Sequence, residues 1–188
     1  MQRHEQRRTR QRVITRLTAV VAGFAALALL GYIIWGLMRP KLGQAVAQQA
    51  RTHIELGDPH EPYNSDPPTS GPHAGTVAAG FYSEAPPDEN LVHNLEHGYV
   101  IIWYDCSILD DAQCQELMGQ IDEVMERARP VVFTTGAKKL IAVPRTGMES
   151  RIALTSWGRH YRLDAFDEPS VMQFINDNRN QAPEPGAP

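Results

Sequence analysis

The feature that most constrains this chain is an uncharged, largely apolar run of 22 residues, from Leu17 to Met38. A helix of that length rises about 33 Å, which is enough to cross a hydrocarbon core of roughly 30 Å. Tyr32 and Trp35 lie near its C-terminal end, where amphipathic rings favour the membrane interface. The run therefore predicts a single transmembrane helix over residues 17–38.

The charges on either side of this run predict its orientation. Six arginines precede it, at positions 3, 7, 8, 10, 12 and 16, whereas Arg39 and Lys41 follow it. Because basic residues stay on the cytoplasmic side, residues 1–16 are expected to form a cytoplasmic basic tail, with the bulk of the chain outside the cytoplasm. A cleaved secretory signal is the alternative, since Ala45-Val46-Ala47 resembles a cleavage site. The apolar region of such a signal normally spans only about 7–15 residues, which favours an uncleaved anchor.

The part of the chain beyond the apolar run is acidic and poor in cysteine. Residues 39–188 hold 12 Lys and Arg residues against 21 Asp and Glu residues. Nucleic-acid binding depends on a basic face, so no nucleic-acid partner is expected. The chain has two cysteines, Cys106 and Cys114, too few for a Cys₄ zinc ribbon or an iron–sulfur cluster. In an oxidising compartment they are expected to form a structural disulfide, because a redox pair is typically spaced as Cys-x-x-Cys.

The distribution of turn residues divides the remainder of the chain. Residues 39–57 are expected to form a polar stalk, with a short helix over 45–52, and residues 58–180 an extracytoplasmic globular domain. The stretch 59–87 contains seven prolines and predicts a long binding loop, because proline excludes long helices and central strands. Residues 181–188, rich in proline, are expected to form a disordered tail.

Hydrophobic periodicity predicts the elements of the globular domain. Helices are expected over 89–97, 110–129 and 168–177, and strands over 99–104, 131–135, 140–143, 152–157 and 160–163. The run at 99–104 is unbroken in β-branched and aromatic residues, as in a strand buried on both faces. This order predicts an α+β (or α/β) sandwich: one mixed sheet with at least two covering helices, preceded by a single transmembrane helix.

Three histidines form the candidate site. His93 and His97 are four residues apart, a spacing that places both imidazoles on one face of a helix. Two such imidazoles suit a transition metal such as copper or zinc, and His73, on the proline-stiffened loop, is the expected third ligand. Weaker candidate ligands are His60, Glu96 and Met148. Thr69, Ser70 and Glu96 are expected to support the loop and the site.

Other interpretations of the same residues stay open. The pattern is not the His-Glu-x-x-His motif of metalloproteases, because Asn94 stands where the general base would be. A nucleophilic site would use Ser70 or Thr69 with a histidine base and Glu96, but hydroxyls in such a turn usually bond to the neighbouring backbone. In a structural interpretation, His93 and His97 hydrogen-bond to loop carbonyls and hold the proline-rich segment against the sheet.

Two motifs carry a resemblance to a known family. They are Tyr63-Asn64-Ser65-Asp66-Pro67-Pro68-Thr69-Ser70-Gly71-Pro72-His73 and His93-Asn94-Leu95-Glu96-His97-Gly98. In this order they resemble the signature of a bacterial family of membrane-anchored domains of unknown function, number 3105. The resemblance implies one N-terminal membrane helix followed by an extracytoplasmic domain, and it implies little about activity.

These observations favour a single-pass, extracytoplasmic accessory or binding protein with one transition metal ion, copper or zinc, at His73, His93 and His97. No catalytic residue is assigned. The expected partners are the membrane and a protein of a membrane complex. The alternatives are a metal-dependent or Ser/His hydrolase of the cell envelope, and a purely structural or protein-interaction module.

Overall fold

The computed structural model describes residues 2–131 and 138–187 of the chain, which divides into the units Met1–Pro40 and Lys41–Pro188. The first unit is helix α1, Gln2–Met38. Its span Arg16–Gly36, 21 residues with a mean hydropathy of 2.3, is long and apolar enough to cross a membrane. Phe24 and Leu27 of this span are 70% and 66% exposed. An exposed apolar surface of this kind is typical of a segment that contacts a membrane or another protein.

The second unit is built on one mixed six-stranded sheet with the strand order β1-β6-β5-β3-β4-β2. Its strands are β1 Gln44–Ala45, β2 Gly80–Phe81, β3 Val100–Tyr104, β4 Leu140–Pro144, β5 Ile152–Ser156 and β6 Arg159–Leu163. Strands β2, β4 and β3 run parallel, whereas β5 is antiparallel to β3 and β6, and β1 is antiparallel to β6. Helix α3 connects the parallel neighbours β3 and β4, as a crossover between parallel strands requires.

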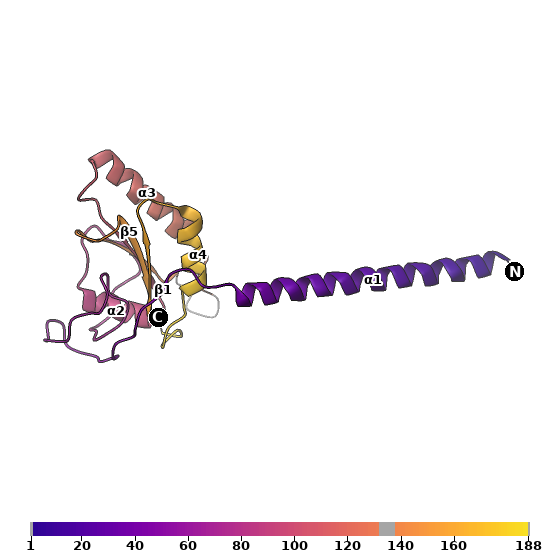
Figure 1. Cartoon of the computed structure of the whole chain (residues 1–188), viewed down its shortest axis with the longest axis horizontal. Helices are drawn as coiled ribbons and strands as arrows, with labels where there is room; N and C mark the ends of the chain where they lie inside the picture. The colour runs from indigo at the N-terminus through magenta and orange to yellow at the C-terminus, as the bar shows by residue number, and fades with distance from the viewer. Residues whose placement is uncertain (1, 132–137, 188) are drawn as a thin grey trace. The chain divides into compact units, whose positions relative to one another are not determined.

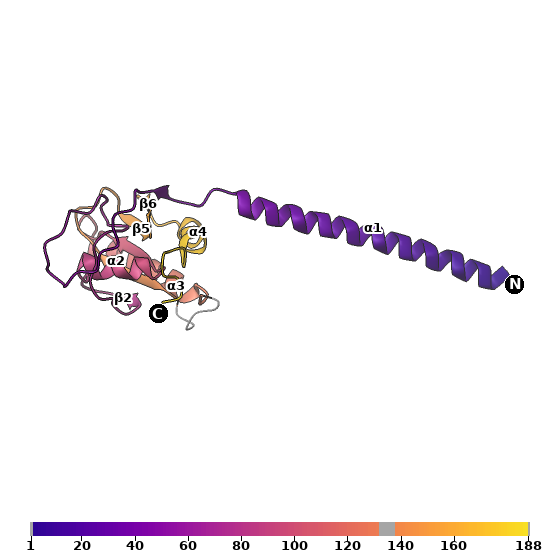
Figure 2. The same cartoon turned by 90° about the horizontal axis from the view of Figure 1, so that it is seen from below.

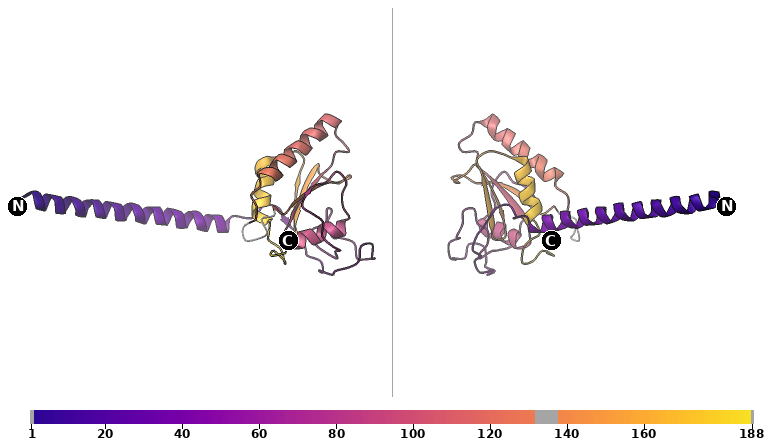
Figure 3. Two further views of the ribbon diagram at one scale, coloured as in Figure 1. Left: turned by 180° about the vertical axis from the view of Figure 1, so that it is seen from behind. Right: turned by 45° about the vertical axis from the view of Figure 1, so that its right-hand side comes forward.

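Helices cover both faces of this sheet. Helix α3, Asp111–Arg127, and helix α4, Glu168–Asn178, lie on one face, and helix α2, Asp88–Glu96, lies on the other (Figure 1). The two further views in Figure 3 show the same arrangement. Strand β3 serves both faces, because Ile102 packs with α3 and α4 and Trp103 packs with α2. The expected mixed sheet with at least two covering helices is confirmed.

Capping residues in the sequence define the N-terminal ends of α3 and α4. Asp110 accepts a hydrogen bond from Gln113 N, and the Gln113 side chain accepts one from Asp110 N, which forms a capping box. The carboxylate of Asp167 caps α4 through Ser170 N. The disulfide between Cys106 and Cys114 closes a short loop that leads into α3 and ends within its first residues. The expected disulfide is confirmed.

Two expectations about the N-terminal part of this unit differ from the structure. Residues 45–52 do not form a helix: Gln44 and Ala45 pair with His160 and Arg159, and the chain continues in an extended path. Cross-strand hydrogen bonding here outweighs a weak helical preference. Part of the segment that we expected to be a stalk therefore adds an edge strand to the sheet. The strand expected over 131–135 falls at positions 132–135 outside the described residues.

The last residues of the chain are held by a buried lysine. Lys139 is fully buried, and its Nζ donates to the carbonyl oxygens of His97, Pro185 and Ala187 at 2.7, 2.9 and 2.8 Å and to Asn180 Oδ1 at 3.1 Å. Burial lowers the pKa of Lys139. Residues 181–187, which we expected to form a disordered tail, thus lie against the C-terminal end of α2.

Candidate metal centre

Helix α2 presents the first two groups of the site. His93 and Glu96 are three residues apart, so both side chains lie on the same side of the helix. The helix ends immediately afterwards: His97 is its C-cap and Gly98 follows with φ +88°. A Cβ at position 98 would lie 2.7 Å from Asn180 Cα, so glycine is required here both for the turn and for the approach of the C-terminal segment. Helix α2 packs on the side of the sheet opposite α3 and α4, and in Figure 2, which is seen from below, it lies toward the viewer.

Two extended segments add the other two groups. His73 lies within the proline-rich loop and forms an isolated parallel bridge with His53. Ile54 N donates to His73 O at 2.9 Å, and His73 N donates to Thr52 O at 3.0 Å. Ala74 N in turn donates to Glu89 O of α2 at 3.1 Å. Backbone hydrogen bonds therefore join the three segments that carry the imidazoles.

The four side chains converge on one point. One ligand atom from each of His53, His73, His93 and Glu96 lies within 4.8 Å of the other three. In a tetrahedral site with each ligand atom about 2.1 Å from the ion, the ligand atoms lie about 3.4 Å from one another, so the widest pair would have to approach by at most about 1.4 Å to hold one. His73 and Glu96 are buried, His93 is half-buried and His53 is exposed, which leaves the site open to solvent on one side.

The hydrogen bonds of His73 determine which of its nitrogens faces the cluster. Its Nδ1 lies 2.8 Å from Gly71 O, which can only accept, so Nδ1 carries the hydrogen. In the neutral ring, Nε2 then presents a lone pair 2.9 Å from Glu96 Oε2. Neither of these buried atoms has a hydrogen-bond partner of acceptable geometry, although they are this close. Two apposed acceptors without a shared hydrogen bond are the arrangement that a cation between them would stabilise.

His93 is oriented in the same way. Its Nδ1 donates to Ala74 O, so Nε2 is the nitrogen with the free lone pair. Burial lowers the pKa of His93, the neighbouring imidazoles of His73, His97 and His53 lower it further, and the hydrogen bond to Ala74 partly opposes this shift. The ring is therefore neutral at pH 7, the state in which imidazole binds metals.

The two oxygens of Glu96 have separate contacts. Oε1 lies 3.3 Å from the guanidinium of Arg51, which is half exposed, whereas Oε2 faces His73. Arg51 comes from the same extended segment as His53. It therefore orients the carboxylate from outside the cluster, a role that neighbours of metal ligands commonly have.

Of the three histidines expected to be ligands, the structure brings His73 and His93 into the cluster together with Glu96. The ring of His97 lies 4.6 Å from that of His93, centroid to centroid, but His97 is not among the four converging groups. Its Nε2 lies 3.7 Å from Glu184 Oε2 in the C-terminal segment. His97 N still donates to His93 O as in a helical turn, so the two rings lie side by side, but the imidazole of His97 pairs with Glu184 and does not join the cluster.

The remaining candidates lie elsewhere or support the loop. His60 lies beside Glu61 O and Glu89 Oε1, and Met148 packs among the apolar side chains of the α2 face. Thr69 and Ser70 are fully buried: Ser70 Oγ accepts from Gln49 N, and Thr69 O accepts from Gly158 N. These contacts hold the proline-rich loop against the preceding segment and the sheet.

His53 is the group that sequence reasoning missed. It lies in the segment that we expected to be a stalk, and no neighbouring residue forms a recognisable ligand spacing with it. Its role depends on the backbone pairing of residues 52–54 with His73, which are about 20 positions apart. Local periodicity carries no signal for a contact of this kind.

Comparison with known proteins identifies the family and no function. The family model described as "Protein of unknown function (DUF3105)" matches residues 58–188. No curated protein matches the chain, and neither does any solved structure. The matched region contains His73, His93 and Glu96, whereas His53 precedes it. The chain therefore belongs to the DUF3105 family, as the two motifs indicated.

Proposed function

We propose that this chain is a single-pass membrane protein whose extracytoplasmic domain binds one transition metal ion through His53, His73, His93 and Glu96. It acts as a binding or accessory protein without catalysis of its own. The observation that supports this most directly is the pair His73 Nε2 and Glu96 Oε2, which are buried, 2.9 Å apart and without hydrogen-bond partners. Orphaned acceptors of this kind are rare in a folded protein unless something else satisfies them.

The donor set favours zinc or copper. Three imidazole nitrogens and one carboxylate oxygen match the four-coordinate preference of Zn²⁺, and imidazole-rich sites bind Cu²⁺ at least as tightly. A calcium or magnesium site would instead be rich in oxygen ligands. With four protein ligands, a tetrahedral ion has no position left for substrate, which favours binding over catalysis.

The test is metal analysis of the full chain, purified in detergent without chelators and then titrated with Zn²⁺ or Cu²⁺. We expect one equivalent per chain. His93→Ala should weaken binding by at least about 100-fold, and the exposed ligand variant His53→Ala by about 10-fold or more, since even the neighbours of metal ligands contribute 10–100-fold.

His97→Ala is the matched control, because His97 adjoins His93 without joining the cluster. It should change the dissociation constant by less than about threefold, because its side chain is not one of the four groups that would contact the ion. Retained cooperative unfolding of each variant shows that the fold has survived. A wild-type chain that retains no metal, or a His53→Ala chain that binds as tightly as the wild type, refutes the proposal.

The membrane topology in this proposal is supported by two features of the chain. Six arginines precede the apolar run 17–38, and both cysteines form a disulfide, a bond typical of oxidising compartments. The pairing of β1 with β6 supports an uncleaved anchor, because cleavage after Ala47 would remove this strand. Protease added to intact cells should digest the domain. Protection of the domain until the cells are lysed contradicts this orientation.

A metal-dependent hydrolase is the second candidate, favoured by one observation: the exposed His53 leaves the cluster accessible to solvent. If His53 is a loosely held ligand, a water molecule can replace it. Asn94, at the position of the metalloprotease base, instead hydrogen-bonds with both Val77 N and Val77 O at 3.0 and 2.9 Å and is fully buried. A metal-loaded chain that hydrolyses ester or peptide substrates with turnover would establish this alternative over binding alone.

A further inference from the structure

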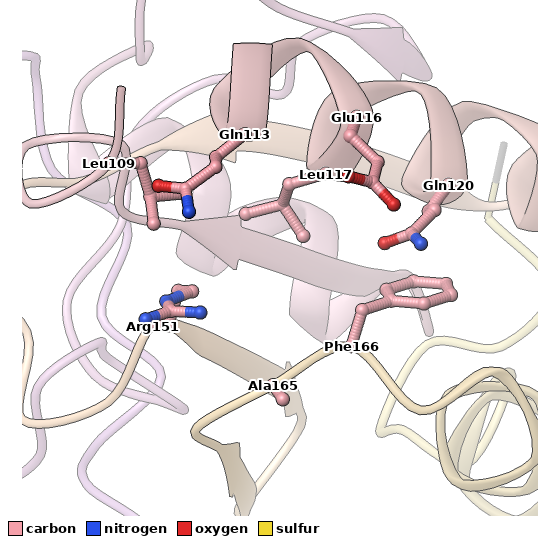
Figure 4. A pocket seen from close by; sticks show the side chains of 8 residues that line it. All are labelled: Leu109, Gln113, Glu116, Leu117, Gln120, Arg151, Ala165 and Phe166. Carbon is pink, nitrogen blue, oxygen red and sulfur yellow. The ribbon is translucent and has the colours of Figure 1, made fainter. Parts of the chain in front are cut away.

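A cavity lies on the face of the sheet opposite the candidate metal centre, between α3 and the loop that follows β6. It has a volume of about 280 Å³ (Figure 4). Leu109, Leu117 and Phe166 form its apolar walls, and Arg151, Gln113 and Glu116 contribute polar groups. Figure 4 shows Arg151 and Gln113 near one end of the cavity, with Glu116 further along α3. None of these side chains belongs to the metal centre.

The walls of this cavity are fixed by covalent and capping interactions. Leu109 lies within the loop closed by the disulfide between Cys106 and Cys114. The side-chain oxygen of Gln113 is held by Asp110 N in the capping box, which leaves the amide hydrogens of Gln113 free to donate. The cavity is therefore already formed before any ligand binds, as is usual for small-molecule sites.

Arg151 is the unexplained group at this cavity. Its backbone is fixed, since Arg151 O accepts from Asp105 N at 2.9 Å. Its Nε is buried without a hydrogen-bond partner, and among the described residues no carboxylate forms an ion pair with its guanidinium. A buried Nε–H without an acceptor is costly, so an acceptor supplied from outside the chain would be stabilising.

Two acidic side chains near Arg151 are already engaged. Arg151 also borders a neighbouring cavity whose acidic lining residues are Asp105, Glu149 and Asp164. The carboxylate of Asp105 accepts from Ser107 N and Gly147 N, and that of Glu149 pairs with Arg162 at 2.8 Å. Among the described residues that line the cavity beside α3, Arg151 is the one cationic side chain.

We infer that this cavity is a binding site for a small monocarboxylate with an apolar body. The carboxylate would accept hydrogen bonds from Arg151, whose planar fork matches its geometry, and from the Gln113 amide. The apolar body would lie against Leu117 and Phe166. Glu116 further along the cavity disfavours a second negative charge, so dicarboxylates and inorganic phosphate fit poorly.

The test uses the full-length chain in detergent micelles, with isothermal titration calorimetry and hexanoate as the probe. Hexanamide has the same shape without the charge, and acetate has the charge without the apolar chain. We expect hexanoate to bind at least about tenfold more tightly than either, because both the charged hydrogen bonds and the apolar contact contribute. Acetate binding as tightly as hexanoate would overturn the proposed ligand class.

Matched variants separate the site from uptake by the micelle. Arg151→Gln should weaken hexanoate binding by about tenfold or more, whereas Arg129→Gln, the same loss of charge at an exposed position, should leave it unchanged. Glu116→Gln should bind hexanoate about threefold more tightly, since a like charge is removed at an exposed position where folding is not at risk. The site is refuted if Arg151→Gln and Arg129→Gln behave alike, or if no heat exceeds that of empty micelles.

Discussion

The two faces of the central sheet bury different kinds of side chain. The face covered by α3 and α4 is closed by apolar side chains such as Ile102, Ile121 and Phe174, all fully buried. The face covered by α2 also has an apolar centre around Trp103, but it buries His73 and Glu96 at its border as well. Burying polar groups is unfavourable unless they have partners, so the α2 face carries an energetic cost that the α3–α4 face does not. The candidate metal centre lies where that cost is found.

The largest expected effect belongs to the apolar face. Phe174→Ala should lower the free energy of unfolding by about 3–5 kcal/mol, because it removes a fully buried ring from α4 and leaves a cavity. Denaturant unfolding of the full chain in detergent measures the loss. The dissociation constant for Zn²⁺ should stay within about twofold of the wild type while the protein is folded, and a parallel loss of metal affinity contradicts the separation of the two faces.

Acid should act on the opposite face through His160. Burial, helped by Arg162 and opposed by Asp66 and Glu149, lowers the pKa of His160 from 6.5 to about 4. The unfolded chain therefore binds a proton at this ring before the folded chain does, and stability falls as the pH drops from about 6.5 toward 4. The loss amounts to roughly 3 kcal/mol at the acid end, and above pH 6.5 this group contributes none.

The variant His160→Gln isolates this effect, with His60→Gln as a control for the loss of a less buried ring. Between pH 7 and pH 4, the free energy of unfolding of the wild type should fall by roughly 3 kcal/mol relative to that of His160→Gln. Denaturant unfolding at each pH measures this difference. A difference that stays constant with pH shows that His160 is not the acid-sensitive group.

The next largest loss in the free energy of unfolding is expected from removal of the disulfide beside α3. Closing the short loop between Cys106 and Cys114 contributes about 2.5 kcal/mol in the chain-entropy treatment. The double variant Cys106→Ser with Cys114→Ser should therefore unfold at a lower denaturant concentration, with metal binding at His93 unaffected. Equal stability of the two chains in denaturant unfolding would indicate that the capping box alone is enough to hold this loop.

The smallest effect on stability, and the sharpest test of the contrast between the faces, is expected for Glu96→Gln. An amide at this position can donate to His73 Nε2, so the metal-free protein should gain about 1 kcal/mol. The same change should weaken Zn²⁺ binding by at least about 100-fold. Unfolding with chelator and metal titration measure the two quantities. If the metal-free variant is less stable than the wild type, His73 and Glu96 form an ion pair in the metal-free protein and are not two unpaired metal ligands.

Regular elements were predictable because their signals are local. Leu117, Ile121, Val124 and Met125 recur at helical spacing, and these four side chains are the buried face of α3. The apolar run before Asp105 likewise predicted a strand buried on both faces, and all five residues of β3 are buried. The expectation was least accurate for residues 45–52, where pairing with a strand more than 100 residues away determines the conformation.

By itself, the sequence determined that the chain has one apolar helix of membrane-spanning length, a mixed sheet and two histidines, His73 and His93, near one another. The helix and the strands follow from the character of neighbouring residues, and the pairing of the two histidines followed from their residue type and the proline-rich loop. The tertiary structure alone decided that His53 and Glu96 converge with them, whereas His97 contacts Glu184. The reason lies in long-range contacts: an extended segment returns to pair with His73, and the C-terminal segment brings Glu184 to His97. Contacts between segments far apart in the sequence are not encoded in a local pattern.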